Sequence, residues 1–373
     1  VNQEVGLELV NDTFMEAVEK TELEVVSQSD LDRGVLQEGE PFHYSFVVEV
    51  RPKVVAQDYK NIPAKRPPME VSDEEVAAEL VLRRQTNFHL ESIGELRPIQ
   101  QGDHAVLDFK TFADGKPVPD GEARGFHLEV GSNRFSPEFE NELIGASKGE
   151  EREIQVVFPV DYGNKNLAGK NATFQVEVKD IKEKVLPELN DEFAKNLGEF
   201  ESLEDLRSVV RQELESTKTK RIDDEVWVQI GDELIKRNPF EVPTSMVEQE
   251  LQRMLDTIRY RLSSQNLTLE QAGMDEDTFR ERNRELADKR VRTSILLERI
   301  SHQEGLEIND EELDQSLHST AEKMNQPYDK VKDFYLRSNM MDSYRHQLLE
   351  DKVINFLRDQ ANITEGEQTT TSG

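Results

Sequence analysis

The sequence contains no cysteine and no long hydrophobic run. The absence of thiols excludes disulfide bonds, thiolate metal ligands and a cysteine nucleophile. A membrane-spanning helix needs about 18 consecutive apolar residues, and no such run occurs. The N-terminal string VNQEVGLELV lacks a basic region followed by an apolar core, so the sequence predicts neither a signal peptide nor a membrane partner. The cytoplasm is the simplest expected compartment.

Positive charge is scarce as well. The 373 residues include 46 Lys and Arg against 77 Asp and Glu, which gives a formal net charge of −31. No run of Lys or Arg is long enough to form a basic patch, and a chain of this charge repels phosphate backbones. Direct binding to DNA or another nucleic acid is therefore not expected. With 33% charged and 35% hydrophobic residues, the composition favours about two or three domains in an extended chain over one large globule.

The common signatures of metal and acid–base catalysis are also missing. The seven histidines are scattered singly, with no His-Glu-x-x-His string and no pair at metal-ligand spacing. The string GNKNLAGKN departs from a phosphate-binding loop in its glycine spacing and in its last residue, and no Gly-x-Ser-x-Gly elbow occurs. We therefore expect no metal and no cofactor. Two activities need no cluster of ionisable side chains: the binding of other chains through apolar surface, and peptidyl-prolyl isomerisation.

What is present is a change of hydrophobic period along the chain. Residues 1–52 have apolar residues at helical spacing in LELVNDTFMEAVEK and then alternate in polarity over 41–50, which is typical of the tail of an α+β domain. From 97 to 184 the period is two, with turn signals at Asp114-Gly115 and Asp120-Gly121. One short helix is expected there, around PEFENELIGA.

The remaining sequence is mostly helical in pattern. Residues 53–96 comprise a proline-rich linker and the string SDEEVAAELVLRRQTNFHLES, where Ser72 and Glu75 form a capping box before an amphipathic helix that packs with the helical domain. Residues 185–364 predict that helical domain, and 365–373 predict a disordered polar tail. Apolar residues recur at four-residue steps at Ile222, Val226, Ile230 and Leu234.

Several boundaries are predicted within the helical domain. Ser245 and Glu248 match a capping box for the helix that follows NPFEVP. Further helices are expected at 277–303, 310–324, 327–337 and 340–360.

The β-rich segment resembles the FK506-binding-protein (FKBP) type of prolyl isomerase domain. The matching strings are Val106-Leu107-Asp108-Phe109, Asp114-Gly115, Phe126-His127-Leu128-Glu129-Val130-Gly131, Pro137-Glu138-Phe139-Glu140 and Phe158-Pro159-x-x-Tyr162-Gly163. The string after it, KVLPELNDEFAKNLGEFESLEDLR, is similar to the segment that joins this domain to the helical arms in the bacterial trigger factor family of ribosome-associated chaperones. The resemblance spans nearly the whole chain.

The resemblance implies a multidomain α+β fold. It comprises a partial α+β N-terminal domain, an FKBP-like antiparallel β-sheet with a short helix, and an extended all-α C-terminal domain with arms. The implied function is that of an ATP-independent chaperone for newly synthesised polypeptides with prolyl isomerase activity. One alternative is a stand-alone FKBP-type isomerase whose helical flanks bind a defined partner. Another is an interaction protein with an inactive isomerase module.

By matching the family motif, the residues that line the isomerase pocket are Phe109, Phe126, Phe139, Tyr162 and Phe174. Phe139 would be the floor, and the Tyr162 hydroxyl would be available to a substrate carbonyl. Each aromatic could instead be an ordinary core residue.

Two positions depart from the family pattern. Val118-Pro119-Asp120 stands where related isomerases commonly have Phe-Asp, and Ser136 replaces an apolar residue, so we expect reduced turnover. Phe135 is a weaker candidate for substrate contact.

In the helical domain, methionines are candidates for contact with nascent or unfolded chains because their side chains are flexible and polarizable. The candidates are Met246, Met254 and Met324, together with Met340 and Met341; a stripe at helical spacing is more often core.

The ribosome is an expected partner only through a segment outside this sequence. The family's docking loop, Gly-Phe-Arg-x-Gly-Lys-x-Pro, does not occur here. Because residues 1–52 resemble the second half of the ribosome-binding domain, we expect that loop to lie upstream of Val1.

Overall fold

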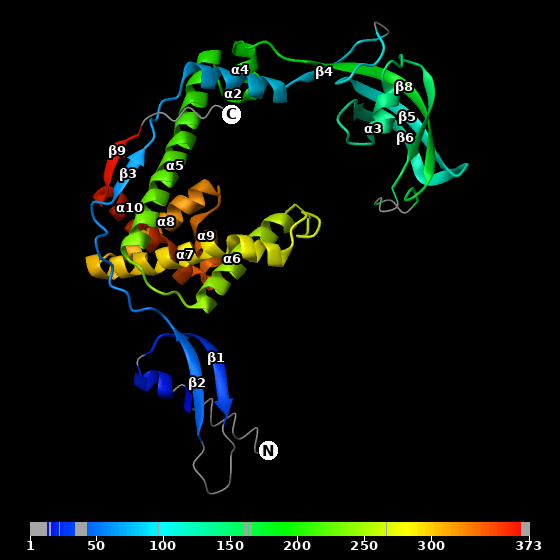
Figure 1. Cartoon of the computed structure of the whole chain (residues 1–373). Coiled ribbons are helices and arrows are strands. Elements are labelled where there is room, and N and C mark those ends of the chain that lie inside the picture. Colours follow the sequence, from blue (N-terminus) through cyan, green and yellow to red (C-terminus); the bar gives the residue numbers. More distant parts are fainter. Residues whose placement is uncertain are drawn as a thin grey trace. The chain divides into compact units, whose positions relative to one another are not determined.

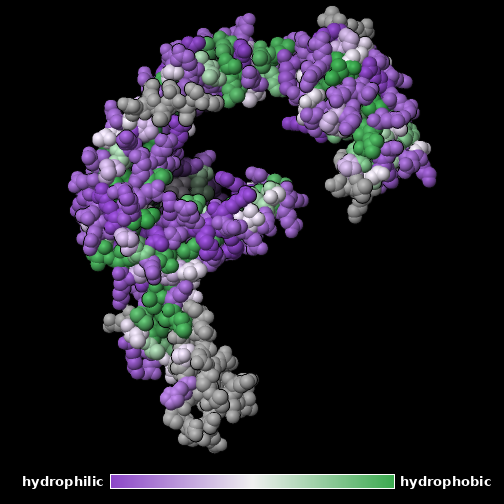
Figure 2. Space-filling view, in the orientation of Figure 1, coloured by the Kyte–Doolittle hydropathy of each residue, from purple (hydrophilic) through white to green (hydrophobic). Residues whose placement is uncertain are grey.

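The computed structural model describes residues 13–14, 16–21, 23–33, 43–94, 97–159, 163, 166–265 and 267–366. They fall into two compact units, one drawn from residues 1–69 and 219–373 and the other comprising residues 70–218 (Figure 1). The visible face of both units is largely hydrophilic, with separate hydrophobic areas (Figure 2). No helix among the described residues is long and apolar enough to cross a membrane.

The unit of residues 70–218 contains a five-stranded antiparallel sheet, as the β-rich pattern predicts. Its strands run in the order β4-β8-β5-β6, and β7 also pairs with β8. One short helix, α3, covers a face of this sheet (Figure 1). The elements are β4 (His89–Ser92), β5 (His104–Ala113), β6 (Lys116–Glu129), α3 (Pro137–Leu143), β7 (Glu151–Val157) and β8 (Asn171–Val185).

The two turn signals of this segment have different outcomes. Asp114 (φ 51°) and Gly115 (φ 76°) form the tight turn between β5 and β6, where both central residues need positive φ. Asp120-Gly121 does not end a strand, so that expectation was wrong. It lies in a bulge of β6, because Lys110 pairs with Glu122 while Phe112 pairs with Pro117.

The same unit has three helical segments outside the sheet: α2 (Asp73–Thr86), α4 (Asp191–Leu197) and the first part of α5 (Leu203–Arg237). The predicted capping box is present, since Glu75 N–H donates to Ser72 Oγ (3.2 Å) and Ser72 N–H donates to Glu75 Oε2 (2.8 Å). The string after Ser72 is not helical throughout, because β4 follows the end of α2. Buried Leu80, Phe193 and Leu206 join the three helices in one core.

The other unit contains a β hairpin and a small parallel ribbon. In the hairpin, β1 (Val25–Arg33) pairs antiparallel with β2 (Tyr44–Val50), which lies in the predicted 41–50 segment. In the ribbon, β3 (Pro63–Arg66) pairs in parallel with β9 (Asn362–Glu365). The sequence predicted no strand at β9, because its partner lies near the other end of the chain.

The described residues of this unit between 219 and 360 are mostly helical, as predicted. Ile222, Val226, Ile230 and Leu234 are buried along the second part of α5, against residues of α7 and α10. The helices after α5 are α6 (Thr244–Ser263), α7 (Glu276–Glu304), α8 (Asp310–Lys323), α9 (Tyr328–Arg337) and α10 (Met341–Gln360).

The predicted capping box at α6 was wrong. The N-cap is Pro243, so Ser245 lies inside the helix. The backbone N–H of Ser245 donates instead to the Glu49 carboxylate of β2 (3.0 Å), while Glu248 forms ion pairs with Arg280 and Arg284 of α7. A distant carboxylate therefore replaces the local cap.

Candidate functional site

Five phenylalanines of the β module pack against one another and form what we call the phenylalanine cluster. They are Phe109 of β5, Phe126 of β6, Phe135 of the loop before α3, Phe139 of α3 and Phe174 of β8. The Phe109 ring centroid lies 5.5 Å from that of Phe126, 5.8 Å from that of Phe174 and 6.3 Å from that of Phe139. These distances and the steep interplanar angles are typical of edge-to-face contact.

The structure therefore brings together Phe109, Phe126, Phe139 and Phe174, which the sequence predicted as lining residues, and adds Phe135 as a full member. Tyr162, the other predicted lining residue, lies outside the described residues.

Strand register explains why these rings meet. On β5 and β8, alternate residues face the same side of the sheet. Phe109 pairs with Val176, and Thr111 pairs with Phe174, so the two aromatic positions are diagonal neighbours on that side. Helix α3 supplies Phe139 and Leu143 at a spacing of four residues, and both are fully buried. The period-two pattern of the strands and the four-residue step of the helix thus converge on one core.

A buried glutamate holds the loop that leads to this cluster. Glu140 of α3 is only 1% exposed. Its carboxylate accepts hydrogen bonds from the backbone N–H groups of Gly131 (2.8 Å), Asn133 (2.9 Å) and Phe135 (3.1 Å). Because the carboxylate satisfies three loop donors at once, it fixes the backbone at Phe135. In the sequence, Glu140 is recognisable only as the last residue of the string Pro137-Glu138-Phe139-Glu140. A signal for its burial is its place on a short helix between the apolar residues Phe139 and Leu143.

The departures from the family pattern lie at the edge of the cluster. Ser136 occupies the N-cap position of α3, but its side chain does not cap the helix. Its hydroxyl donates to Glu138 Oε2 (2.6 Å), and this hydrogen bond lowers the pKa of Glu138. Val118 lies in the β6 bulge and packs against the module core.

Charged groups gather at the start of β5. Arg97 donates to Asp103 Oδ1 (2.9 Å) and to Glu183 of β8 (3.1 Å). Burial alone raises the pKa of Asp103, but hydrogen bonds from Arg97 and the Gln100 N–H hold it below its ordinary value. Burial lowers the pKa of neighbouring His104, an effect that Glu129 opposes. None of these groups belongs to the phenylalanine cluster.

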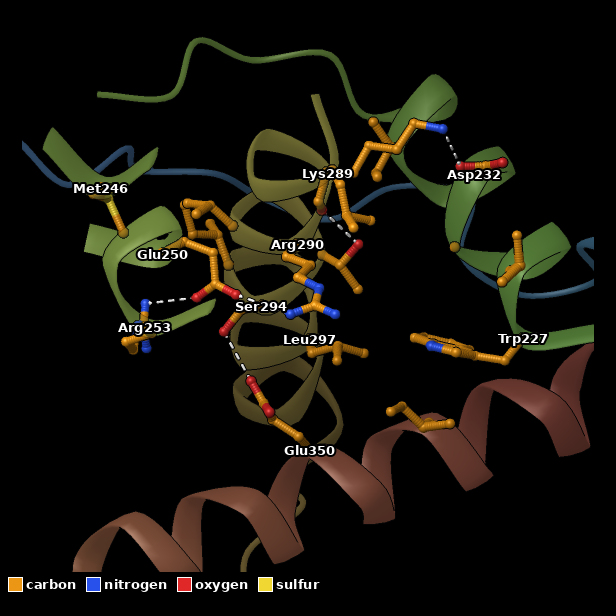
Figure 3. A pocket seen from close by; sticks show the side chains of 18 of the residues that line it. Trp227, Asp232, Met246, Glu250, Arg253, Lys289, Arg290, Ser294, Leu297 and Glu350 are labelled. Carbon is orange, nitrogen blue, oxygen red and sulfur yellow. Dashed lines mark hydrogen bonds and ion pairs between the residues drawn. The ribbon is translucent and has the colours of Figure 1, made fainter. Parts of the chain in front are cut away.

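A second candidate site is a groove among α5, α6, α7 and α10, with a volume of about 630 Å³. Its apolar lining includes Trp227, Ile235, Met246, Leu286, Leu297 and Ile354. Figure 3 shows Met246 and Trp227 on opposite sides of α7, with α10, which carries Glu350, along the lower edge of the view.

Several charged side chains around this groove are paired with one another. Lys289 binds Asp232 (3.1 Å), and Glu250 binds both Arg253 (3.1 Å) and Arg290 (3.4 Å). We call this site the helical groove. Its apolar surface is thus bordered by ion pairs, each of which joins a basic and an acidic side chain.

The structure separates the predicted methionines. Met246 lines the helical groove, whereas Met254 packs against the core between α6 and α7. Met324 ends α8 and is 60% exposed, outside the groove. Met340 is exposed and Met341 is half-buried against the α8–α10 core. Within the part of the chain that the structure describes, no group of three or more His, Cys, Asp or Glu could hold a metal ion.

Comparisons with known proteins match most of the chain. A model of the bacterial trigger factor protein matches residues 1–82, a model of its C-terminus matches residues 202–359, and a model of FKBP-type peptidyl-prolyl cis-trans isomerase matches residues 96–179.

Several curated relatives are trigger factors. The protein of Geotalea daltonii is 38% identical over 361 residues, covering 96% of this chain and 83% of that protein. The protein of Geobacter metallireducens is 38% identical over 358 residues, covering 96% and 83%. The protein of Halothermothrix orenii is 35% identical over 353 residues, covering 94% and 82%.

One solved structure also shares the fold. It is described as "Promiscuous Substrate Recognition in Folding and Assembly Activities of the Trigger Factor Chaperone", with a TM-score of 0.50 and 22% identity, covering 96% of this chain and 85% of that chain.

Proposed function

Because this chain belongs to the bacterial trigger factor family, we propose that the phenylalanine cluster is its isomerase site and that the helical groove receives unfolded polypeptides. The chain is a molecular chaperone for nascent or unfolded polypeptides, with FKBP-type peptidyl-prolyl cis-trans isomerase activity. A stand-alone isomerase would not account for the trigger factor matches at residues 1–82 and 202–359.

The observation behind the proposed isomerase site is the contact among four phenylalanines that lie far apart in the sequence and that the family resemblance assigns to one pocket. Rotation about an Xaa-Pro bond faces a barrier of about 20 kcal/mol, because the planar amide loses its resonance. The twisted amide is less polar than the planar one, so an apolar wall stabilises it more than the ground state and lowers the barrier. This mechanism needs no ionisable group. The resemblance adds Tyr162 as a donor to a substrate carbonyl.

A matched pair of substitutions on β5 tests this site. Phe109→Leu removes a ring that contacts all four other members of the cluster. We expect kcat/KM for a tetrapeptide with one Leu-Pro bond to fall about tenfold, or about 1.4 kcal/mol of transition-state stabilisation. Phe112→Leu makes the same chemical change on the same strand outside the cluster, and we expect normal kinetics. Equal kinetics for both variants would place the active site elsewhere.

For the helical groove, the supporting observation is an apolar lining open to the surface and framed by paired charges. Trp227 lines the groove and is the only tryptophan of the chain. We therefore expect a permanently unfolded, tryptophan-free protein to shift the emission of Trp227. Met246→Ser and Leu286→Ser should weaken this binding, because each removes apolar lining. A saturating client that leaves the emission unchanged would argue against the groove.

We also propose the domain division expected from the sequence: 1–52, 53–96, 97–184, 185–364 and 365–373. Its support is that the described residues that form the core of the β module run from Ile93 to Ile181, close to the proposed bounds of 97–184.

We further propose a cytoplasmic location. These 373 residues by themselves should bind ribosomes weakly and DNA not at all, because the docking string Gly-Phe-Arg-x-Gly-Lys-x-Pro does not occur in them and their net charge is −31.

A further inference from the structure

The floor of the proposed isomerase site is covered in this structure. Phe139 is 0% exposed and Phe174 is 2% exposed. A ring that contacts the proline of a substrate must be accessible to the substrate, and neither the Phe139 ring nor the Phe174 ring is accessible. Some part of the module therefore has to move before a prolyl ring can lie against Phe139.

Among the described residues, the aromatic ring nearest to the floor is that of Phe135. Its ring centroid lies 4.6 Å from that of Phe139, with the ring planes tilted by 51°. It also lies 5.5 Å from Phe174, 5.8 Å from Phe126 and 6.0 Å from Phe109. Centroid distances of this size mean direct ring contact, which leaves no room for a prolyl ring between Phe135 and its neighbours. Unlike Phe139, Phe135 is itself only partly buried.

The setting of Phe135 allows its side chain to move while its backbone stays in place. The other four rings project from β5, β6, α3 and β8, whereas Phe135 lies in the loop between β6 and α3. Its backbone N–H is held by the Glu140 carboxylate (3.1 Å). Movement is therefore a rotation of the side chain toward solvent, which a partly exposed residue makes far more readily than an enclosed one.

We propose that Phe135 is a gate in the isomerase pocket: its ring occupies the access to Phe139, and a prolyl substrate must displace it. This inference rests on the proposed assignment of the phenylalanine cluster as the isomerase site. Displacement separates Phe135 from four rings, so the open state is a minor one. The apparent affinity for substrate is reduced by the fraction of molecules in the open state. The gate acts on ground-state and transition-state binding alike, so its effect falls on KM rather than on kcat.

The test uses the full chain with Phe135→Val, Phe135→Leu and the matched control Phe112→Val. The assay is isomerisation of a tetrapeptide with one Leu-Pro bond, after thermal melting has established that each variant is folded. We expect Phe135→Val to lower KM about tenfold and to leave kcat within about twofold of normal. Phe135→Leu, which retains more bulk, should lower KM about threefold, so the proposal remains testable if the valine variant does not fold. Phe112→Val should have normal KM and kcat.

Two results would overturn the proposal. If KM for the folded Phe135 variants is unchanged or higher, Phe135 is a fixed wall that binds substrate. If the folded variant Phe139→Leu isomerises the peptide normally, the cluster is not the isomerase site, and the proposed site fails together with its gate. A lowered KM for the Phe135 variants, together with a loss of activity for Phe139→Leu, supports both the site and the gate.

Discussion

Removal of the Phe139 ring is the most direct perturbation of the proposed isomerase site. This ring is fully buried and contacts Phe135, Phe174 and Phe109, with centroids 4.6, 5.1 and 6.3 Å away. Replacing a core phenylalanine by alanine costs about 3–5 kcal/mol. A small domain has a total stability of about 5–15 kcal/mol, so Phe139→Ala leaves the module marginally folded.

Phe139→Leu is therefore the more informative variant, because it removes the ring and leaves the module folded. It keeps an apolar side chain at the floor but removes the aromatic face, at a cost of about 1–2 kcal/mol, within the usual range for a single core substitution. If the twisted amide is stabilised against this face, kcat/KM should fall at least about tenfold, which corresponds to about 1.4 kcal/mol of transition-state stabilisation.

The assay is isomerisation of a Leu-Pro tetrapeptide at a temperature where thermal melting shows that the variant is folded. Suppression of client aggregation, followed by light scattering in the same preparation, should be unchanged. Phe139→Leu protein that is folded and catalyses at the normal rate would refute the assignment of this floor.

Three further outcomes are expected. Deletion of residues 97–184 should leave the helical parts able to suppress client aggregation in a light-scattering assay; a folded deletion protein that fails would show that this activity requires the β module. Burial holds the pKa of His104 below its ordinary value of 6.5. The unfolded chain therefore binds a proton at His104 more readily than the folded chain does. The stability that depends on neutral His104 is complete above pH 6.5 and falls as the pH drops toward the folded-state pKa. The melting temperature of His104→Gln should therefore depend less on pH between about 7.5 and 5.5 than that of the unmodified chain; equal dependence would mean that another group titrates. The 373-residue chain should cosediment with ribosomes only weakly at physiological salt; stoichiometric pelleting would show a docking surface that is not among those described.

Several features were predictable from the sequence because they depend on residues a few positions apart. The capping box of Ser72 and Glu75 satisfies helix-end donors within one turn. Asp114-Gly115 provides the positive φ values that a tight hairpin requires. The spacing of Ile222, Val226 and Ile230 places them on one buried helix face. In each case, local backbone geometry or a simple period determines the outcome.

The family resemblance went further and indicated which phenylalanines to expect at the proposed site. It placed Phe109, Phe126, Phe139 and Phe174 together, and the strand register then brought them into contact. The methionines could not be sorted from their spacing, because Met246 lines the helical groove only through the packing of α5, α6, α7 and α10.

Contacts between residues far apart in the chain were not predictable from the sequence, because they depend on how whole elements pack. The start of α6 is capped by Glu49 of β2, and β3 finds its parallel partner in β9 near the other end of the chain. At the proposed site, the sequence alone could name Phe135 and Glu140 but could not place them. Glu140 binds the loop N–H groups because the fold buries its carboxylate where backbone donors converge. The Phe135 ring contacts Phe139 because the fold brings the loop before α3 next to that helix.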